Sequence, residues 1–307
     1  MEPNSENYKV PGQSILVVDD EEQVCELLAE ALTYMGHEVV TARDGQDALE
    51  KLEHANFHIV ITDLDMPRMD GMELIRYLVQ NRNGTDIIAI TGHAMKYRYT
   101  DVVAAGAADF ISKPFSLDEL EAKVKRVIRE RELRTELERL AIHDPLTGLY
   151  NRHFFARIVR REAVRSIRYE HALFLFYLDV DRFKEYNDKH GHQAGDQLLI
   201  QLSKALKASV RQDVDTAFRF GGDEFTVLLP HLDRDQAGMV AERIRQNYNS
   251  LGLEPTHLSI GMARFRAKSG DVDLDVEDMI HRADGALYRA KHDLGGNTAC
   301  LDKDSLF

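Results

Sequence analysis

The first third of the chain alternates short, continuously apolar runs with amphipathic stretches. The apolar runs lie at residues 14–18, 37–41, 57–62, 87–90 and 109–111, and helical patterns lie between them at 22–34, 46–54, 72–81 and up to about 106. Apolar strands that alternate with helices are typical of a parallel sheet covered by helices on both faces. We therefore predict an α/β domain with a doubly wound five-stranded parallel sheet over residues 12–118.

A charged stretch without glycine or proline follows this domain. Its apolar residues form two stripes at helical spacing, the first of Leu120, Val124 and Val127 and the second of Leu133, Leu137 and Leu140. The stripes do not share one heptad phase, because Arg131 lies where the first predicts an apolar residue. One interpretation is a solvated helix with one face on the first domain. We favour the other, a helical linker over residues 119–143 that forms a parallel coiled coil with a second copy, with the phase break as a place where register could switch.

The remainder, residues 144–307, mixes strands and helices in a less regular order. Strand patterns lie at 172–178, 217–220, 225–229, 257–265 and 298–301, and helical patterns at 154–168, 196–209, 233–248 and 276–291. Two of the strands form a central hairpin. This mixture predicts an α+β domain with an antiparallel core.

Composition narrows the class of protein. The length of 307 residues suits two domains, and 44% hydrophobic residues suffice for two cores. The longest apolar run, 172–178, is too short to span a bilayer, and the N-terminus lacks the pattern of a signal peptide. Cys25 and Cys300 lie in different domains, which suits a reducing compartment. The net charge of −13 disfavours nucleic acid and anionic membrane as partners, so we expect a cytoplasmic protein.

Polar residues follow the predicted strands of the first domain at their carboxyl ends, where doubly wound sheets bind ligands. They are Asp19, Asp20, Asp63, Thr91 and Lys113. Each alone is more simply explained as a helix cap or a solvated residue, but a set at four converging strand ends indicates a site. With residues 63–71 and 112–115, the set resembles the response-regulator receiver domain.

The resemblance implies a phosphorylation site. Asp63 would accept a phosphoryl group from a histidine kinase. Asp20, Asp63 and the Asp65 carbonyl would hold Mg²⁺, with Asp19 in support. The residues that would bind the phosphoryl oxygens and switch the domain are Thr91, Phe110 and Lys113.

The hairpin of the second domain carries two adjacent acids. A Gly-Gly turn at 221–222 is followed by Asp223 and Glu224, and Asp179 and Asp181 end another strand about forty residues earlier. Gly-Gly hairpins alone are weak evidence, because they also occur where there is no chemistry. Carboxylates at neighbouring strand ends can hold Mg²⁺, and such sites act on nucleotide phosphates.

Residues 219–225 resemble the signature of the GGDEF-domain diguanylate cyclases. Those enzymes condense two GTP into cyclic di-GMP and two pyrophosphates. Segments 144–152, 179–187, 191–196, 259–261 and 283–291 match further motifs of that family in the same order. The resemblance implies a palm-like nucleotidyl cyclase fold, and a homodimer, since each protomer would present one GTP.

The resemblance also assigns residues to the cyclase site. The groups that would bind Mg²⁺ or Mn²⁺ are Asp179, the Val180 carbonyl, Asp223 and Glu224, with Asp223 also as proton acceptor. The groups that would bind phosphate are Lys184, Lys291 and the backbone N–H groups near Arg182 and Phe183. Asn187 and Asp196 would read guanine. The Asp196 carboxylate can accept from guanine N1–H and the 2-amino group together, which favours GTP over ATP.

Two departures from the family change the expected regulation. Many members have an inhibitory Arg-x-x-Asp motif; here Asp215 keeps its place, but the arginine position holds Gln212, with Arg211 one residue early. Arg243 matches a secondary inhibitory arginine. Near the end, residues 291–297 lack the family's arginine, so a phosphate contact is expected to be lost.

The leading functional prediction is a phosphorylation-activated diguanylate cyclase, the output of a two-component system. The alternative is a catalytically inactive module that binds GTP or cyclic di-GMP and relays receiver phosphorylation by protein contact. Inactive members usually lose the signature acids or the guanine-reading residues, and this chain keeps both. The sequence therefore favours the enzyme.

Overall fold

The computed structural model describes residues 12–82, 84–92 and 96–303. The chain divides into two compact units, Met1–Glu136 and Leu137–Phe307. Within the described residues, no helix is both long and apolar enough to cross a bilayer.

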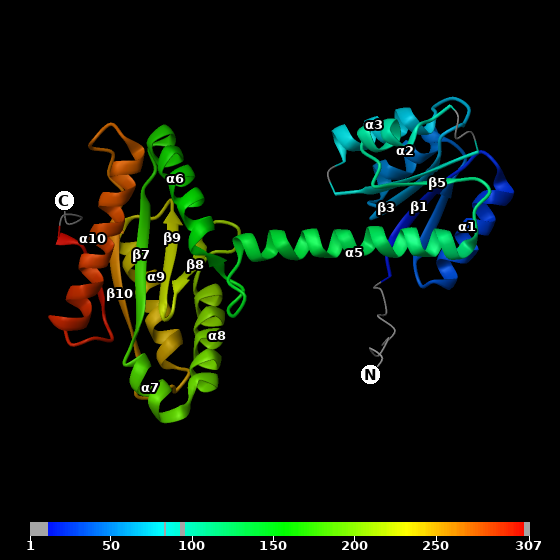
Figure 1. The fold of residues 1–307 in the computed structure, drawn as a ribbon. Helices are drawn as coiled ribbons and strands as arrows, with labels where there is room; N and C mark the ends of the chain where they lie inside the picture. The colour runs from blue at the N-terminus through cyan, green and yellow to red at the C-terminus, as the bar shows by residue number, and fades with distance from the viewer. Residues whose placement is uncertain (1–11, 83, 93–95, 304–307) are drawn as a thin grey trace. The chain divides into compact units, whose positions relative to one another are not determined.

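The first unit is a parallel five-stranded sheet in the order β2-β1-β3-β4-β5. Its strands are β1 (Ser14–Val18), β2 (Glu38–Ala42), β3 (Ile59–Asp63), β4 (Asp86–Thr91) and β5 (Asp109–Ser112), and its helices are α1 (Glu22–Tyr34), α2 (Gly45–His54), α3 (Gly71–Asn81), α4 (Tyr99–Ala104) and the first part of α5 (Leu117–Ile142). Helices α1 and α5 pack on one face of the sheet, and α2 and α3 pack on the other (Figure 1). The predicted doubly wound sheet is confirmed.

Helix α5 is continuous over 26 residues. The first apolar stripe, with Leu120 and Val124, is buried against the sheet. The second stripe is exposed, with Leu133 at 58% and Leu137 at 67% of their surface. The helix therefore matches the sequence, and an exposed leucine stripe suits a partner helix. The coiled coil itself stays a prediction.

The second unit is a six-stranded sheet in the order β11-β10-β7-β9-β8-β6. Its strands are β6 (Tyr150–Asn151), β7 (Leu173–Asp181), β8 (Thr216–Gly221), β9 (Glu224–Pro230), β10 (His257–Arg264) and β11 (Ala299–Leu301). The four central strands are antiparallel, and the two edge strands pair in parallel. The predicted antiparallel core is confirmed.

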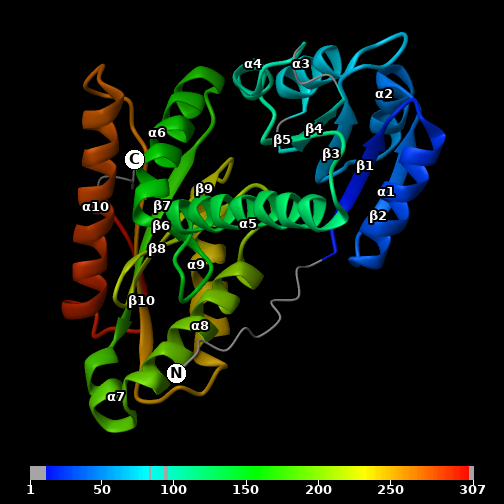
Figure 2. The ribbon, with the colours of Figure 1, turned by 45° about the vertical axis from the view of Figure 1, so that its right-hand side comes forward.

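The helices of this unit cover both faces of its sheet. They are α6 (Arg152–Tyr169), α7 (Phe183–His190), α8 (His192–Ser209), α9 (Arg234–Asn249) and α10 (Val272–His292). Helices α8 and α9 bury one face, and α6 and α10 bury the other (Figures 1 and 2). This layering brings the C-terminal ends of β7 and α10 and the start of β9 to one region of the domain.

Two local predictions were wrong. The hairpin turn consists of Gly222 and Asp223, not of two glycines, because the strand pairing extends to Gly221 and Glu224. Gly222 supplies the left-handed backbone of the turn, with φ 53°. Residues 183–190 form a separate helix, α7, which the sequence pattern did not predict, and α8 begins at His192 rather than at 196.

Candidate active site and phosphorylation site

The first unit has a compact acidic cluster at the carboxyl edge of its sheet. Asp19 and Asp63 are buried, Asp20 is exposed, and one ligand atom from each lies within 4.8 Å of the others. Among the described residues this is the one group of three acids that meets so closely. Burial is the main cause of a raised pKa for Asp19, and the charge of Asp63 adds to it. A cluster of this kind favours a hard divalent cation.

Lys113 lies directly on this cluster. Its Nζ contacts Asp19 Oδ2 at 2.9 Å and Asp63 Oδ2 at 2.5 Å. Burial opposes the charge on Lys113, but hydrogen bonds to Asp63 and Asp19 outweigh burial and raise its pKa to about 12. The lysine is therefore a fixed cation beside the predicted phosphoacceptor.

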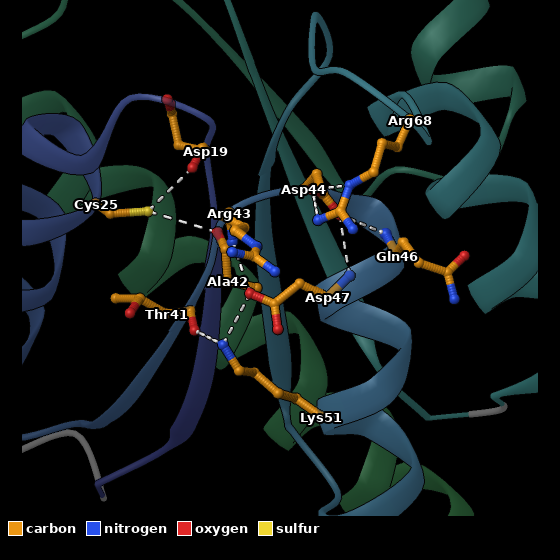
Figure 3. A network of polar contacts seen from close by, with 10 residues as sticks. All are labelled: Asp19, Cys25, Thr41, Ala42, Arg43, Asp44, Gln46, Asp47, Lys51 and Arg68. Carbon is orange, nitrogen blue, oxygen red and sulfur yellow. Dashed lines mark hydrogen bonds and ion pairs between the residues drawn. The ribbon is translucent and has the colours of Figure 1, made fainter.

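A polar network supports this edge of the sheet (Figure 3). Buried Asp44 caps α2 by accepting from the N–H groups of Gln46 and Asp47 with one oxygen. Its other oxygen accepts from Arg68 Nε at 2.6 Å. Arg68 lies in the loop between β3 and α3, so this ion pair ties the loop that follows Asp63 to the start of α2. Sequence reasoning missed this pair, because nothing in the linear pattern joins positions 24 residues apart.

The remaining receiver residues lie near this edge. Thr91 is the last residue of β4 and is buried. Phe110 is partly buried, with its ring 6.3 Å from that of Tyr99 in an edge-to-face arrangement. The Asp65 carboxylate contacts Lys96, and Tyr97 Oη donates to it at 3.2 Å. The loop after β4 is thus joined to the loop that follows Asp63.

The second unit places its acids on neighbouring strands. Asp179 on β7 lies directly opposite Glu224 on β9 in the antiparallel register, and Asp223 precedes Glu224 in the turn. Asp223 and Glu224 do not join Asp179 in a group as tight as the receiver cluster. Val180 points its side chain into the core, where it is 1% exposed. The structure therefore brings the four predicted metal positions to one end of the hairpin without closing them around a point.

Asp179 has the most perturbed carboxylate of this group. Burial raises its pKa to about 6, and the charges of Asp223 and Asp181 add to the rise, while Lys291 opposes it. Lys291 Nζ on α10 lies 2.5 Å from Asp179 Oδ1. A buried carboxylate whose pKa is raised further by two neighbouring acids indicates a site suited to a cation.

The predicted base-reading residues lie on the two helices after β7. The Asn187 side chain on α7 packs against Gly195 on α8, where any β-carbon would lie 1.8 Å from Asn187 Oδ1. This buried oxygen has no hydrogen-bond partner among the described residues. Asp196 follows Gly195 and is exposed. An unsatisfied acceptor beside an exposed carboxylate suits a ligand that offers N–H donors.

Three of the residues predicted to bind phosphate, Arg182, Phe183 and Lys184, lie at the start of α7. Arg182 precedes the helix with a left-handed backbone, φ 60°, and its guanidinium pairs with Glu185 at 2.8 and 2.9 Å. As at the start of any α-helix, the first N–H groups of α7, including that of Phe183, have no carbonyl partner within the helix, and such groups can bind an anion. Lys184 is exposed one residue later.

Arg219 was not given a role from the sequence. Its Nη1 donates to both Asp144 oxygens, at 3.0 and 3.1 Å, while Nε and Nη2 donate to the Gly222 carbonyl at 3.0 and 2.8 Å. One side chain therefore joins the start of the domain to the hairpin turn. The signal was an arginine three residues before the turn together with an aspartate that opens the first motif.

The predicted inhibitory residues are engaged in internal contacts. Arg211 donates to Asp215 through Nη2 at 2.6 Å and to the Pro230 carbonyl at 2.6 Å. Arg243 donates to the Ser209 carbonyl through Nε at 3.0 Å and Nη2 at 2.6 Å. Arg211, Gln212 and Asp215 line a cavity of about 400 Å³. Both guanidinium groups are thus committed to the protein itself.

A receiver-like sheet with an acidic cluster and a palm-like sheet with acids at its hairpin define a receiver joined to a nucleotidyl cyclase domain. The chain matches the family "Diguanylate cyclase, GGDEF domain" over residues 141–297 and "Response regulator receiver domain" over residues 15–125. The chain belongs to the GGDEF family and carries a receiver domain before the GGDEF domain. Both resemblances drawn from the motifs are confirmed.

Curated relatives and a solved structure agree with this assignment. Diguanylate cyclase DgcM of Escherichia coli is 35% identical over 55% of this chain and 41% of its own length. Response regulator PleD of Caulobacter vibrioides is 28% identical over 95% of this chain and 66% of its own length. The coiled coil and GGDEF domain of DgcB from Caulobacter crescentus, in complex with c-di-GMP, has a TM-score of 0.52 and 28% identity over 60% of this chain and 97% of that one. The chain thus spans between about two fifths and two thirds of the curated relatives.

Proposed function

We propose that this protein is a phosphorylation-activated diguanylate cyclase that condenses two GTP into cyclic di-GMP and two pyrophosphates. In this proposal residues 12–118 are the receiver, 119–143 a coiled-coil linker and 144–307 the cyclase. The protein works as a cytoplasmic homodimer and receives its phosphoryl group from a histidine kinase. The observation that carries the cyclase is Asp179, with its raised pKa, facing Glu224 and contacted by Lys291.

The reaction needs two attacks of the same kind, in each of which the 3′-oxygen of one guanosine nucleotide attacks the α-phosphorus of the other. The new O–P bond forms as the bond to pyrophosphate breaks, and the hydroxyl proton passes to Asp223. Lys184, Lys291 and the N–H groups at the start of α7 bind the phosphates. A divalent cation held by Asp179, the Val180 carbonyl, Asp223 and Glu224 would lower the pKa of the hydroxyl and balance the phosphate charge.

Specificity for guanine rests on the two helices after β7. Asp196 accepts from guanine N1–H and the 2-amino group, and the unsatisfied Asn187 oxygen provides a further acceptor nearby. Adenine offers no such pair of donors, and a site built to hydrogen-bond its ligand rejects an analogue that lacks the matching donors. GTP is therefore the proposed substrate.

The receiver site supports phosphorylation of Asp63. Asp19, Asp20 and Asp63 are close enough to share one divalent cation, with the Asp65 carbonyl as a further ligand. Lys113 already contacts Asp63 and would bind a phosphoryl oxygen on it. Thr91 and Phe110 would then move in response to phosphorylation of Asp63 and alter the surface of the domain.

Incubation of the purified protein with GTP and Mg²⁺, with and without a small phosphodonor, tests the proposal. Formation of cyclic di-GMP that increases with the donor is the expected result. Binding of GTP or cyclic di-GMP without any turnover would support the inactive module instead. Turnover that does not change when the phosphodonor is added would support the cyclase activity but would contradict regulation by the receiver.

A further inference from the structure

Helix α5 is attached to the receiver by two kinds of contact. Up to Ile128 it packs through buried apolar side chains. One turn later, Arg131 Nη1 reaches the edge of the sheet, where it donates to the His58 carbonyl at 3.1 Å and to the Gly84 carbonyl, and it lies 3.0 Å from Asp86 Oδ2. This is the position at which the apolar stripe is interrupted.

A second arginine completes the arrangement. Arg134 Nη2 lies 2.7 Å from Asp86 Oδ1, so each oxygen of that carboxylate contacts one arginine of α5. The side chains of Asp86 and Arg131 are only 11% and 23% exposed. Ion pairs with a largely buried carboxylate that also include backbone carbonyls are more rigid than exposed surface pairs.

The location of these contacts matters for regulation. Asp86 is the first residue of β4, and the predicted switch residue Thr91 is the last. At the carboxyl edge of the sheet, α5 begins four residues after Lys113. The helix is therefore held at both edges of the sheet, over about 21 Å from Leu117 to Arg131 at 1.5 Å per residue.

We propose that Arg131 and Arg134, bound to Asp86, form an anchor that makes α5 move as one body with the receiver. The anchor positions the linker so that a change at Asp63 reaches the cyclase domain, and this inference rests on the proposed phosphorylation-activated function. An apolar residue at 131 would continue the stripe but would remove the donor to Gly84 and Asp86. The phase break thus has a structural cause: the first stripe ends at the anchor, and the exposed stripe begins beyond it.

Full-length variants test the anchor. Arg131→Ala removes the central donor, and Asp86→Asn keeps an acceptor oxygen but removes the charge that both arginines contact. Arg129→Ala is the matched control, because Arg129 lies on the same helix and is exposed. For each variant we would measure cyclic di-GMP formation with and without beryllofluoride, beryllofluoride binding by ¹⁹F NMR, and hydrogen exchange of residues 130–136.

The expected result separates coupling from folding. In Arg131→Ala and Asp86→Asn, the ratio of stimulated to basal activity falls to about one, because the contiguous link from receiver to linker is broken. Basal activity and beryllofluoride binding stay at wild-type levels, exchange at 130–136 becomes faster, and Arg129→Ala keeps the full ratio. A merely structural role would lower thermal stability without changing this ratio.

Full stimulation of cyclase activity by beryllofluoride in both anchor variants, together with faster hydrogen exchange at residues 130–136, would overturn the proposal that the anchor couples the receiver to the linker. Activity in Arg131→Ala that stays at the stimulated level without beryllofluoride would also overturn it, because the contact would then be a restraint on the linker. Wild-type protein that makes no cyclic di-GMP, or that binds beryllofluoride without stimulation, would instead count against the proposed function. The two failures are therefore distinguishable.

Discussion

Replacement of Asp179 by asparagine should make the cyclase domain more stable while it removes activity. The folded protein holds this carboxylate with a pKa of about 6, mainly through burial and then through the charges of Asp223 and Asp181. In an unfolded chain the same group has a pKa near 3.9. The folded state therefore retains the proton more strongly, and the ionised form is disfavoured in it.

The direction and size of the effect follow from this difference. The contribution of Asp179 to stability is fully present below about pH 4 and is lost as pH rises through about 6. A shift of roughly two pKa units corresponds to about 3 kcal/mol as an upper limit, since each unit is about 1.4 kcal/mol. For a domain of this size that is roughly 6–12 °C in Tm. Asn keeps the shape and an oxygen for Lys291 but has no charge to lose.

Thermal unfolding in EDTA at pH 4, 6 and 8 would measure this effect. We expect Asp179→Asn to match the wild type at pH 4 and to exceed it by several degrees at pH 8. Mg²⁺ should raise the Tm of the cyclase domain in the wild type and leave the Tm of that domain unchanged in the variant, while the receiver site is intact in both. Asp188→Asn, which removes an exposed carboxylate on α7, is the matched control and should follow the wild type throughout.

A variant no more stable than the wild type at pH 8 would refute the reasoning. It would mean that the ion pair with Lys291 outweighs the repulsion from Asp223, so that the carboxylate is a net support of the fold. Greater stability with retained cyclase activity would refute the other half, the assignment of Asp179 to the catalytic site.

Three further outcomes are expected. Asp223→Ala and Glu224→Ala should each lower cyclic di-GMP synthesis by at least about a hundredfold without lowering the Tm, since neither acid belongs to the hydrophobic core; near-normal turnover would remove them from the site. Asp63→Asn should keep basal activity and lose stimulation by beryllofluoride, and a response equal to that of the wild type would reject the phosphoacceptor. Added cyclic di-GMP should inhibit poorly in progress curves, because Arg211 is already paired with Asp215; strong inhibition that disappears in Arg211→Ala would contradict this.

The sequence was sufficient for the architecture because each strand of the receiver is a continuous apolar run between amphipathic segments. The cyclase hairpin was equally visible as two apolar strands around glycines. The local detail of the turn was wrong, since strand pairing carried β8 to Gly221 and left Asp223 in the turn, and the short helix α7 was not predicted. A pairing register depends on the partner strand, so a linear pattern does not specify it.

What the sequence did not reveal are contacts between distant polar residues. In the sequence, Arg131 only interrupts the apolar stripe of α5, whereas the structure shows it bound to Asp86 and to two backbone carbonyls. Arg219 stood inside the signature, but its contact with Asp144 spans 75 residues. Such pairs depend on which strand ends the fold brings together, and periodicity carries no information on that.

The two candidate sites share one electrostatic arrangement, although their folds differ. In each, burial raises the pKa of an acid at a strand end, Asp19 in the receiver and Asp179 in the cyclase. In each, a lysine from a later element contacts the acids, Lys113 at 2.5 Å from Asp63 and Lys291 at 2.5 Å from Asp179. Both lysines are also the predicted phosphate ligands. In the proposed function, a protein with a net charge of −13 would bring anionic phosphate to acidic strand ends by means of a cation and a lysine that contacts the acids at each site. Loss of either lysine should therefore both raise the pKa of the acid beside it and weaken phosphate binding.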